Sequence, residues 1–480
     1  MRTEPALLSA PQIELPSPSH PLSLSVYLSF MIGSPRKRTR QAVTPSRVAA
    51  AEIMRALRQG QMLDQAFEVA VRALDPRDRR WVQELCWGTL RNRGMIDAWL
   101  ADRVKGGLDR LDSDVVDLLR LGAYQLRFMD SVPPYAAIGQ TVELVKDVVG
   151  MGAAGLVNAV LRRLDRDRAT LDAASTDDDA IAQLATRYSH PRWLVSRWVT
   201  RWGHDVAAAV LAANNGEAPL GVRPLGDAAS RDTLRAAMTN AGMQLTDAPF
   251  ALDGWDVRGA SNIPELPGFA EGGFYVQDPA AALVARYAAI PSAAIVLDLC
   301  AAPGGKTIAL ANTAKVVVAA DRAFARLARV RENVMRLRLA NVYLVVADAT
   351  EVPCSAADVV LVDAPCTGTG TFRRHPDARW RLKPSDLAVT CAAQRDILEG
   401  ASRSVRPGGL LVYSTCSLEF EENEGMITAF LAAHPEFVLE PPPGGVVPDE
   451  ALSAGYLNVL PTLAGTDGAF AARLRRRVAA

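Results

Sequence analysis

Cysteine and histidine are scarce in this chain, which has six cysteines and five histidines among 480 residues. No two cysteines have the CxxC spacing, and no two histidines the HxxxH spacing, that metal sites use. So few cysteines exclude a disulfide scaffold and favour a reducing compartment. We therefore expect free thiols and no metal.

Long hydrophobic runs are also lacking. No apolar run approaches the ~20 residues of a membrane-spanning helix, so we expect no membrane partner. Residues 21–33 are the one candidate targeting segment. Arg2 is the only basic residue before them, and a basic cluster at residues 36–40 follows. That charge order is the reverse of a secretory signal, so we expect a cytoplasmic protein.

An excess of charge of one sign is missing too, because 53 basic residues balance 53 acidic ones. The overall basic character of a dedicated nucleic-acid binder is therefore absent, and a polyanionic partner has to be bound by local patches. Only six of the basic residues are lysine. Arginine is the better side chain for phosphate and for stacking on bases, although a lysine-poor composition also arises from genome composition.

The length, about three typical domains, predicts several domains. Residues 1–43 are rich in proline and serine, as in a disordered tail, although translation from Met31 is an alternative. Apolar residues then recur with the helical period, and proline-containing breaks divide them into five to seven helices. We expect an all-α domain at 44–165, a linker at 166–184, a small α+β subdomain at 185–290 and an α/β domain at 291–480.

A basic and aromatic segment lies at the start of the helical domain. Residues 31–110 hold 16 basic against 9 acidic side chains. Interleaved arginine and tryptophan can bind phosphates and stack on bases. The alternative, which the spacing favours, is that the tryptophans are core residues and the arginines face solvent. The residues concerned are Arg79, Arg80, Trp81, Trp87, Arg91 and Arg93.

From residue 291 onward, apolar runs alternate with helical segments. Continuous apolar strands separated by helices predict a parallel sheet covered on both faces. Functional residues are then expected just beyond the carboxyl ends of the strands. The predicted strands are residues 295–299, 316–320, 342–346, 359–362 and 410–413.

The first of these strands runs into Cys-Ala-Ala-Pro-Gly-Gly-Lys-Thr at residues 300–307. A P-loop is excluded, because its first glycine would fall on Cys300, and the glycine spacing does not match a dinucleotide fingerprint. A nucleoside-type ligand remains. Asp321 ends the next strand, where a carboxylate can accept both ribose hydroxyls, and Asp348 follows the third.

Two cysteines follow strand ends on the same predicted edge of the sheet. Cys366 and Cys416 lie among glycines and hydroxyl residues, where the chain turns. A small core side chain, the usual role of cysteine, suits these two poorly. They are either a redox pair or a catalytic pair, and spacing alone does not show whether they touch. The core role does suit Cys86, Cys354 and Cys391.

One chemistry needs two such groups beside a methyl donor. Carbon 5 of a pyrimidine is not nucleophilic until a thiolate adds to carbon 6. A second group then removes the C5 proton so that the thiolate can leave. An acid near N3, which Asp363 can supply, neutralises the charge pushed onto the ring. The base has to leave its stack to be reached.

Three segments carry a family resemblance: residues 297–307, 362–370 and 413–417. They resemble the motifs of the RNA cytosine-5 methyltransferases of the Nol1/Nop2/Sun family. The resemblance implies S-adenosylmethionine as cofactor, Cys416 as nucleophile and Cys366 as a residue that assists product release. Glu419, Glu421, Glu422, Asn423 and Glu424 match the acidic run after the family's Thr-Cys motif. The implied cofactor contacts are Cys300, Ala301, Ala302, Pro303, Gly304, Gly305, Lys306, Asp321, Asp348 and Asp363.

The amino-terminal half carries a second resemblance. Residues 118–126, 132–134 and 155–163 are similar to the NusB-like RNA-binding helical domain of the bacterial RsmB (Sun) branch. Residues 274–278 and 373–377 are similar to further family segments. Residues 467–470 depart from the family, because Ala469 stands where a second aromatic residue is usual, and we assign no site residue to that turn.

The resemblance implies an all-α NusB-like RNA-binding domain, a small α+β subdomain and a Rossmann-like S-adenosylmethionine-dependent methyltransferase domain. The implied activity is methylation of carbon 5 of a cytidine in 16S rRNA, or in a small-subunit assembly intermediate, by a monomer without a DNA partner. Two alternatives stay open. One is the same chemistry on 23S rRNA or tRNA; the other is an RNA-binding assembly or antitermination factor with a vestigial enzyme domain.

Overall fold

The computed structural model describes residues 42–171, 179–260, 262–352 and 356–478. Nearly all of the predicted tail, the alternative start at Met31, part of the predicted linker and Cys354 lie outside these residues. The chain divides into two compact units after residue 42, and the description below concerns the second, which begins at Val43.

The helical period of the amino-terminal half is realised as helices. Proline begins three of them, and the side chains of Asp75 and Asp112 cap two by accepting backbone N–H groups at 2.8 Å. The prediction of five to seven helices is confirmed, since the described residues of this half form seven α-helices. These are α2 (Pro45–Arg58), α3 (Leu63–Ala70), α4 (Pro76–Arg91), α5 (Arg93–Ala101), α6 (Ser113–Phe128), α7 (Pro134–Val148) and α8 (Met151–Arg166).

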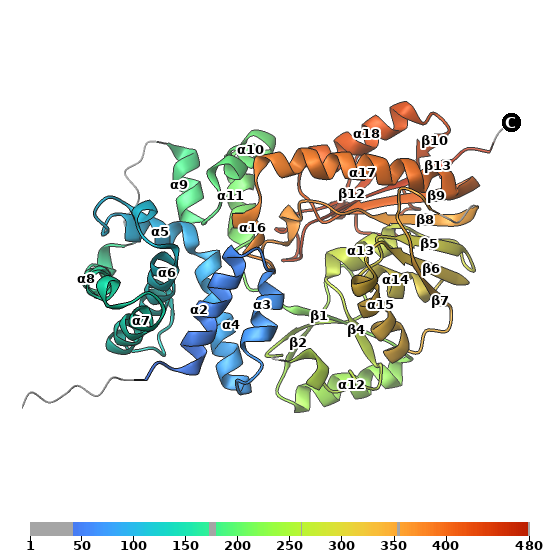
Figure 1. Cartoon of the computed structure of the whole chain (residues 1–480). Coiled ribbons are helices and arrows are strands. Elements are labelled where there is room, and N and C mark those ends of the chain that lie inside the picture. The colour runs from blue at the N-terminus through green and yellow to red at the C-terminus, as the bar shows by residue number, and fades with distance from the viewer. Residues whose placement is uncertain (1–41, 172–178, 261, 353–355, 479–480) are drawn as a thin grey trace, which may run out of the picture. The chain divides into compact units, whose positions relative to one another are not determined.

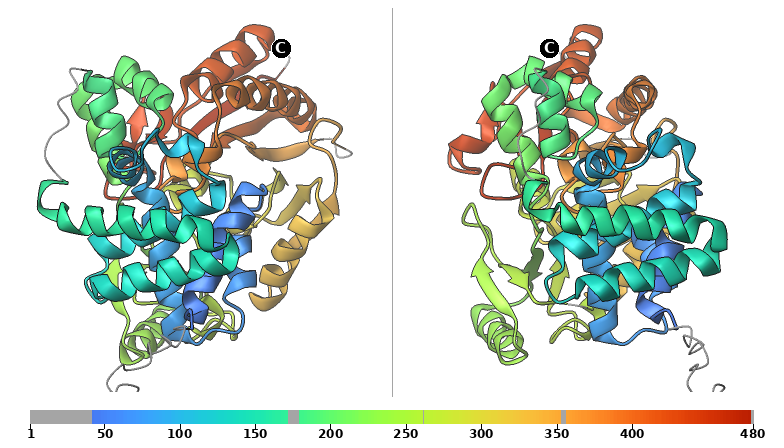
Figure 2. Two further views of the ribbon diagram at one scale, coloured as in Figure 1. Left: turned by 60° about the vertical axis from the view of Figure 1, so that its left-hand side comes forward. Right: turned by 90° about the vertical axis from the view of Figure 1, so that its left-hand side faces the viewer.

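One hydrophobic core joins these helices. Trp87 of α4 is 8% exposed within it, and Trp81 packs against its edge. A Cβ atom at Gly88 would lie 2.0 Å from the ring of Tyr124, so α4 and α6 cross closely only because this residue is glycine. Helices α7 and α8 lie side by side (Figure 2). The interpretation of Trp87 as a core residue is confirmed, whereas Trp81 is half-buried at the edge of the core.

The middle of the chain forms a small α+β subdomain, as predicted. Its four strands make an antiparallel sheet in the order β2-β3-β1-β4. The helices are α9 (Ala180–Arg187), α10 (Arg192–Trp202), α11 (His204–Ala213) and α12 (Ala228–Asn240), and the strands are β1 (Leu220–Pro224), β2 (Gln244–Asp247), β3 (Trp255–Arg258) and β4 (Phe274–Val276).

The carboxyl-terminal part is built on a nine-stranded sheet, counted over the described residues, in the order β11-β12-β13-β9-β8-β5-β6-β7, with β10 paired to β13. Strands β5 to β9 are parallel and β13 runs antiparallel to β9. The strands are β5 (Ile295–Leu299), β6 (Val316–Asp321), β7 (Val342–Val346), β8 (Ala357–Asp363), β9 (Val405–Thr415), β10 (Phe437–Leu439), β11 (Leu452–Ser453), β12 (Tyr456–Val459) and β13 (Ala469–Arg476). All five predicted strands are present.

Helices cover both faces of this sheet (Figure 1). Successive residues of a strand face opposite sides of the sheet, so each face has its own core. In β8, Val360 belongs to one core and Leu361 to the other. Helices α14 and α15 contribute to one core, and α17 and α18 to the other. The helices are α13 (Pro279–Tyr287), α14 (Gly305–Ala311), α15 (Phe324–Arg336), α16 (Ala378–Arg381), α17 (Pro384–Ser404) and α18 (Glu424–Ala433). No helix of the described residues is long and apolar enough to cross a membrane.

Strand register aligns the predicted site residues at one edge of the sheet. Leu299 pairs with Ala320 on one side and with Val362 on the other. Asp363 pairs with Ser414 of β9. The loop after β5, the end of β6, Asp363 and the loop of Cys416 therefore emerge together. The chain order of the strands changes direction between β5 and β8, which is where parallel α/β sheets bind their ligands.

Candidate active site

The loop after β5 turns sharply and presents small residues. Cys300 and Gly304 adopt left-handed backbone, with φ of 61° and 104°. A Cβ atom at Gly304 would lie 3.1 Å from Cγ1 of Val330, so a larger residue there would push against the Val330 side chain of α15 as well as strain the left-handed backbone. Ala301 and Ala302 are each 7% exposed. This loop can therefore lie close to a ligand without side chains in the way.

Asp321 is fixed at the end of β6. Its side chain is 2% exposed and accepts the N–H group of Ala323 at 2.9 Å and that of Ala302 at 3.4 Å. The guanidinium of Arg326 lies 3.6 Å from the same carboxylate and donates to the carbonyl of Ala302 at 3.0 Å. The carboxylate is thus tied directly to the loop after β5.

Asp348 differs from Asp321, because its side chain is exposed. It accepts the N–H group of Thr350 at 2.9 Å and the hydroxyl of Thr350 at 2.8 Å. Those hydrogen bonds lower the pKa of Asp348. Asp321, the last residue of β6, is the register partner of Val346, the last residue of β7. Asp348 lies two residues after Val346, in the loop that follows β7.

Asp363 forms an ion pair at the centre of the edge. Lys306 donates to it at 2.7 Å, and the hydroxyl of Ser414 donates to its other oxygen at 2.9 Å. Burial is the largest single effect on Lys306 and lowers its pKa. The charge of Asp363, the hydrogen bond to Asp363 and the charges of Cys416 and Asp298 together outweigh burial and raise that pKa. Lys306 is therefore a retained ammonium group paired with Asp363.

Cys366 and Cys416 lie together, as the catalytic-pair and redox-pair interpretations both require. Their Sγ atoms are 3.5 Å apart, and both are free thiols. The hydrogen bond to Cys416, together with burial, raises the pKa of Cys366 well above its usual range. Cys366 is thus held as a thiol, and it donates to Cys416 when that residue is a thiolate.

Asp298 is a buried acid that the sequence analysis missed. It lies inside the apolar strand β5 with no exposed surface, and it accepts the hydroxyl of Thr307 at 2.5 Å. Its other oxygen has no hydrogen-bond partner among the described residues. Burial raises the pKa of Asp298 to about 7. Period-based reasoning assigned the strand as apolar. The signal that could have singled out Asp298 is a lone acid within an apolar strand, in the segment 297–307 that carries the family resemblance.

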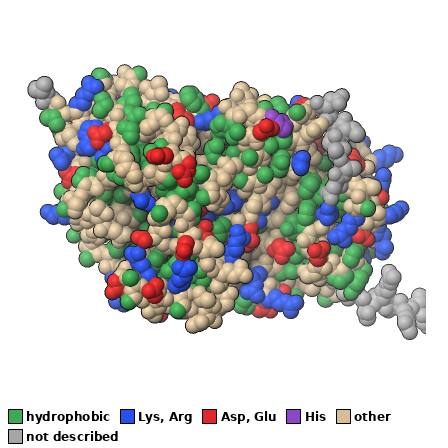
Figure 3. Space-filling model, turned by 180° about the vertical axis from the view of Figure 1, so that it is seen from behind, with side chains coloured by type: hydrophobic (Ala, Val, Ile, Leu, Met, Phe, Trp, Pro, Cys, Tyr) green, Lys and Arg blue, Asp and Glu red, His purple; other side chains and the backbone are tan. Residues whose placement is uncertain are grey.

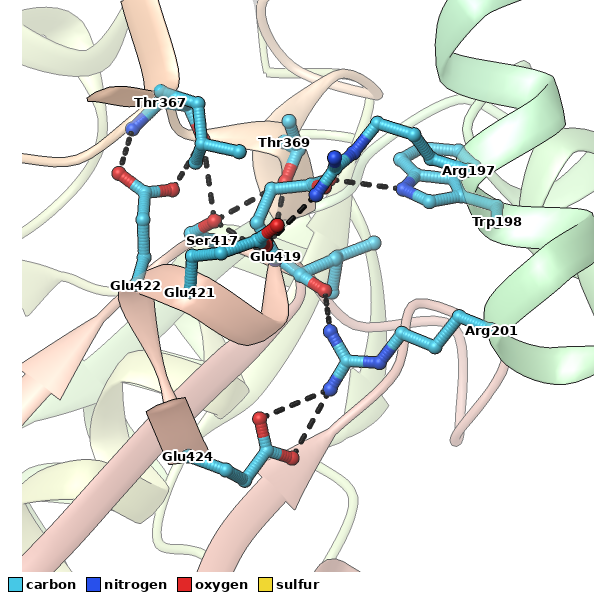
Figure 4. A network of polar contacts seen from close by, with 12 residues as sticks. Arg197, Trp198, Arg201, Thr367, Thr369, Ser417, Glu419, Glu421, Glu422 and Glu424 are labelled. Atoms are coloured by element: carbon cyan, nitrogen blue, oxygen red, sulfur yellow. Dashed lines mark hydrogen bonds and ion pairs between the residues drawn. The ribbon is translucent and has the colours of Figure 1, made fainter. Parts of the chain in front are cut away.

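A second group of polar residues, of which the sequence analysis named only Glu422, joins the two cysteine loops (Figure 4). Glu422 accepts the N–H group of Thr367 at 2.9 Å and the side-chain amide of Gln394 at 3.0 Å. The N–H group of Gly370 donates to the carbonyl of Cys416 at 2.9 Å. The acidic run after Cys416 was a signal for Glu422, whereas Gln394 lies in α17 without any.

Helix α10 also contacts the loop after Cys416 (Figure 4). Glu419 accepts the indole N–H of Trp198 at 3.0 Å and the guanidinium of Arg197 at 2.9 Å. Arg201 donates to Glu424 at 3.0 Å and to the carbonyl of Leu418. The start of the α+β subdomain is therefore bound to the segment that carries the predicted nucleophile.

The arginines of the helical domain correct the expectation for the basic segment. Arg91 donates to the carbonyl of Arg373 at 3.1 Å, and Arg93 stacks on the ring of Trp380 at 5.0 Å. These two arginines therefore contact the segment after Cys366 and are only half-exposed. Helical periodicity alone does not show which face meets another domain. Arg79 is half-exposed and pairs with Glu68 at 3.2 Å, and Arg80 is exposed. Basic and acidic side chains are interspersed on the face of the molecule in Figure 3.

Metal-binding geometry is not present in the described part of the chain, where no three His, Cys, Asp or Glu side chains cluster suitably. The site instead combines a small-residue loop, acids at adjacent strand ends, an ammonium–carboxylate pair and two thiols. The loop and Asp321 suit a nucleoside with a bulky charged substituent. The residues present therefore fit S-adenosylmethionine.

The fold and the site together define an S-adenosylmethionine-dependent methyltransferase with an attached helical domain. Residues 289–475 match the family described as 16S rRNA methyltransferase RsmB/F. Residues 44–166 match the NusB family, and residues 190–263 match the RsmF/B-like ferredoxin-like domain. The chain belongs to the RsmB/F family of rRNA methyltransferases.

Individual relatives agree with this assignment. The chain is 36% identical to ribosomal RNA small subunit methyltransferase B of Vibrio cholerae, with 86% of this chain and 96% of that one covered. It is also 36% identical to the protein of the same name from Pseudomonas putida, over 81% of this chain and 89% of that one. The crystal structure of PH0851 superposes with a TM-score of 0.74 at 25% identity, covering 91% of this chain and all of that one.

These findings confirm several predictions. The chain is an rRNA methyltransferase of the RsmB/Sun type, its cofactor is S-adenosylmethionine and its substrate is RNA. The helical half is a NusB domain, as its motifs predicted, and the small α+β subdomain is of the ferredoxin-like type.

Proposed function

We propose that the protein methylates carbon 5 of a cytidine in 16S rRNA through a covalent bond between Cys416 and carbon 6 of the base. One observation carries this proposal: two free thiols 3.5 Å apart lie at the edge of the sheet where Lys306 and Asp363 are paired. A methyl transfer to oxygen or to an exocyclic nitrogen needs no thiol, whereas transfer to carbon 5 needs a nucleophile and a second group.

The cysteines divide the chemistry between them. Cys416 adds to carbon 6 as a thiolate, which makes carbon 5 electron-rich enough to take up a methyl group. Lys306, which is close enough to Cys416 to be influenced by its charge, stabilises that thiolate. Cys366 remains a thiol during addition. After methyl transfer the C5 proton passes to a solvent water molecule, the C5–C6 double bond re-forms as the bond between carbon 6 and Cys416 breaks, and the proton on N3 returns to Lys306. The Cys366 thiol, 3.5 Å from Cys416, assists by donating a hydrogen bond to the departing thiolate.

Asp363 and Lys306 serve the base as it takes up electron density. Asp363 takes the position near N3, and the Lys306 ammonium group, 2.7 Å from it, supplies the proton that neutralises the ring. Ser414 holds the second oxygen of Asp363 at 2.9 Å and so fixes the direction of the carboxylate. The base reaches these groups only after leaving its stack.

Cofactor binding falls to the loop of residues 300–306 with Asp321, Asp348 and Asp363. S-adenosylmethionine supplies a methyl group on a positively charged sulfur. Asp321 binds the ribose hydroxyls because it is the rigid acid at the end of β6. Asp348, which is exposed, closes the outer end of the same site.

The 16S assignment and a monomeric, cytoplasmic enzyme complete the proposal. The names of the two bacterial relatives, which refer to the small ribosomal subunit, support the 16S target over 23S rRNA or tRNA. The paired thiols oppose a vestigial enzyme domain, since a domain without activity has no need of two cysteines held in contact.

Labelled S-adenosylmethionine and purified protein test this function with 16S rRNA, 23S rRNA and tRNA as substrates. Digestion to nucleosides should give labelled 5-methylcytidine from 16S rRNA alone. The variant Cys416→Ala should transfer no label, while Cys391→Ala, the matched control on α17, should stay active. Label in another nucleoside, or full activity of Cys416→Ala, would overturn the proposal.

A further inference from the structure

We propose that Glu422 is a positioning residue that holds Cys366 against Cys416 and, by its charge, reserves the nucleophilic role for Cys416. This inference rests on the proposed function, because it concerns how the two sulfurs share the work. Glu422 does not line the cofactor loop, and no role was expected for it beyond its place in the acidic run.

The carboxylate of Glu422 is completely buried, yet both of its oxygens are occupied. Oε1 accepts the N–H group of Thr367 at 2.9 Å and the amide of Gln394 at 3.0 Å. Oε2 accepts the hydroxyl of Thr367 at 2.5 Å. These three hydrogen bonds compensate for the loss of water around the buried carboxylate, and they fix its orientation.

These contacts reach both neighbours of Cys366. Thr367, which follows Cys366, is bound directly. Pro365, which precedes it, is bound through Gln394, whose amide donates to the Pro365 carbonyl at 2.9 Å and also to Glu422. One carboxylate therefore fixes the backbone on each side of the sulfur.

Glu422 is equally tied to the loop of Cys416. It lies six residues after Cys416, in the short helical turn Phe420–Glu422, and its backbone carbonyl accepts the hydroxyl of Tyr413 at 2.7 Å. Asn423 donates to the carbonyl of Ser417 at 2.8 Å. The residue that binds the Cys366 loop is thus itself anchored to the strand end and loop that carry Cys416.

The charge of Glu422 acts on the same sulfur. Its negative charge adds to the Cys416 hydrogen bond and to burial in raising the pKa of Cys366. The other titratable or charged groups around the two sulfurs are Tyr413, Lys306 and Asp363. The charge of Cys416 acts on Lys306, whereas the charge of Glu422 acts on Cys366, so the two sulfurs have different charged neighbours.

The substitution Glu422→Gln separates the positioning of the Cys366 loop from the influence of the negative charge. Its amide oxygen can replace Oε1, and its amide nitrogen can donate to the Thr367 hydroxyl, which is able to turn and accept. Glu422→Gln therefore keeps the loop geometry and loses the charge. Glu422→Ala loses both. Glu421→Gln is the matched control, because Glu421 is the neighbouring acid and pairs with Arg197 at 2.7 Å, away from both sulfurs.

The test is the rate of alkylation of Cys366 by iodoacetamide between pH 6 and pH 10, read from its peptide by mass spectrometry. A Cys416→Ser background removes competition from the nucleophile. Below the midpoint of Cys366, Glu422→Gln should raise the rate of alkylation at each pH about tenfold, which corresponds to a pKa lower by about one unit. Glu421→Gln should leave the rate of Cys366 alkylation unchanged. Adding Thr367→Val to Glu422→Gln should change that rate little further.

Turnover supplies the second measurement, in the background with both cysteines. Glu422→Gln should lower kcat by about tenfold and Glu422→Ala by about a hundredfold, with KM for S-adenosylmethionine unchanged. An unchanged rate of Cys366 alkylation together with unchanged kcat in Glu422→Gln would overturn the inference. Alkylation needs no substrate, so a failure of the proposed function, seen as full activity in Cys416→Ala, is recognised separately.

Discussion

Replacing Arg374 by methionine is expected to destabilise the protein by about 3 kcal/mol, because it leaves two buried acids without their main partner. The Arg374 guanidinium donates to Asp467 at 2.7 Å, to Asp278 at 2.5 Å and to the carbonyl of Pro219 at 2.9 Å. The side chains of Asp278 and Asp467 are 9% and 8% exposed. One side chain thus joins the segment after Cys366 to three other segments of the chain.

The magnitude follows from how much of this arrangement survives. Removing one partner of a buried ion pair costs about 3–5 kcal/mol. Arg373 stays within 3.8 Å of Asp278 and 3.5 Å of Asp467, so it compensates for part of the loss and the lower end applies. Arg374→Lys should cost less than Arg374→Met, because a single ammonium group replaces one of the three contacts.

Urea unfolding at pH 5 and pH 8 measures the effect. Burial already raises the pKa of Asp467 in the native protein. Without Arg374 it rises further, so folding favours the protonated acid and the deficit of Arg374→Met should shrink at pH 5. A loss below about 1 kcal/mol, or an equal loss at both pH values, would refute the view that this cluster is a buried charge network.

Three further predictions concern other parts of the molecule. The raised pKa of Asp298, about 7, favours the protonated acid in the folded state, so its contribution to stability is lost as the pH rises from about 4 to 7. Asp298→Asn should flatten that part of the stability profile by up to about 4 kcal/mol, and an unaltered profile from calorimetry would contradict this. Gly304→Ala, at φ 104° and 3.1 Å from Val330, should weaken S-adenosylmethionine binding about tenfold by calorimetric titration, and equal affinity would refute the tight turn. Trp380→Phe loses the hydrogen bond to the Leu90 carbonyl at 2.8 Å and should cost about 1 kcal/mol in urea unfolding, whereas no change would mean that this domain contact contributes nothing.

Much of the sheet was predictable because buried parallel strands are continuous apolar runs between helices. The edge that carries the site followed from the same topology, since the carboxyl ends of parallel strands meet. Asp321, Asp363, Cys366 and Cys416 could therefore be selected from their positions after strand ends. That the two sulfurs lie 3.5 Å apart could not be known, because spacing along the chain says nothing about distance between two loops.

The residues that were missed or misread have a common physical cause. Asp298 and Gln394 are buried in a strand and a helix that read as ordinary core elements, so their polar contacts depend on tertiary packing alone. Arg91 and Arg93 read as exposed cations, and only the approach of another domain turns them into interface residues. The close approach of Gly88 to Tyr124 of α6 likewise cannot be predicted from the helical period of the sequence.

The covalent bond between Cys416 and the RNA base is the central claim, and the variant Cys366→Ala tests it most directly. Without Cys366, release should stall, so incubation with S-adenosylmethionine and 16S rRNA should yield an RNA–protein adduct that survives denaturant. Nuclease and protease digestion followed by mass spectrometry should place a methylated cytidine on the peptide that contains Cys416. An adduct on any other residue, or methyl transfer by Cys366→Ala at the wild-type rate with no adduct, would contradict the account.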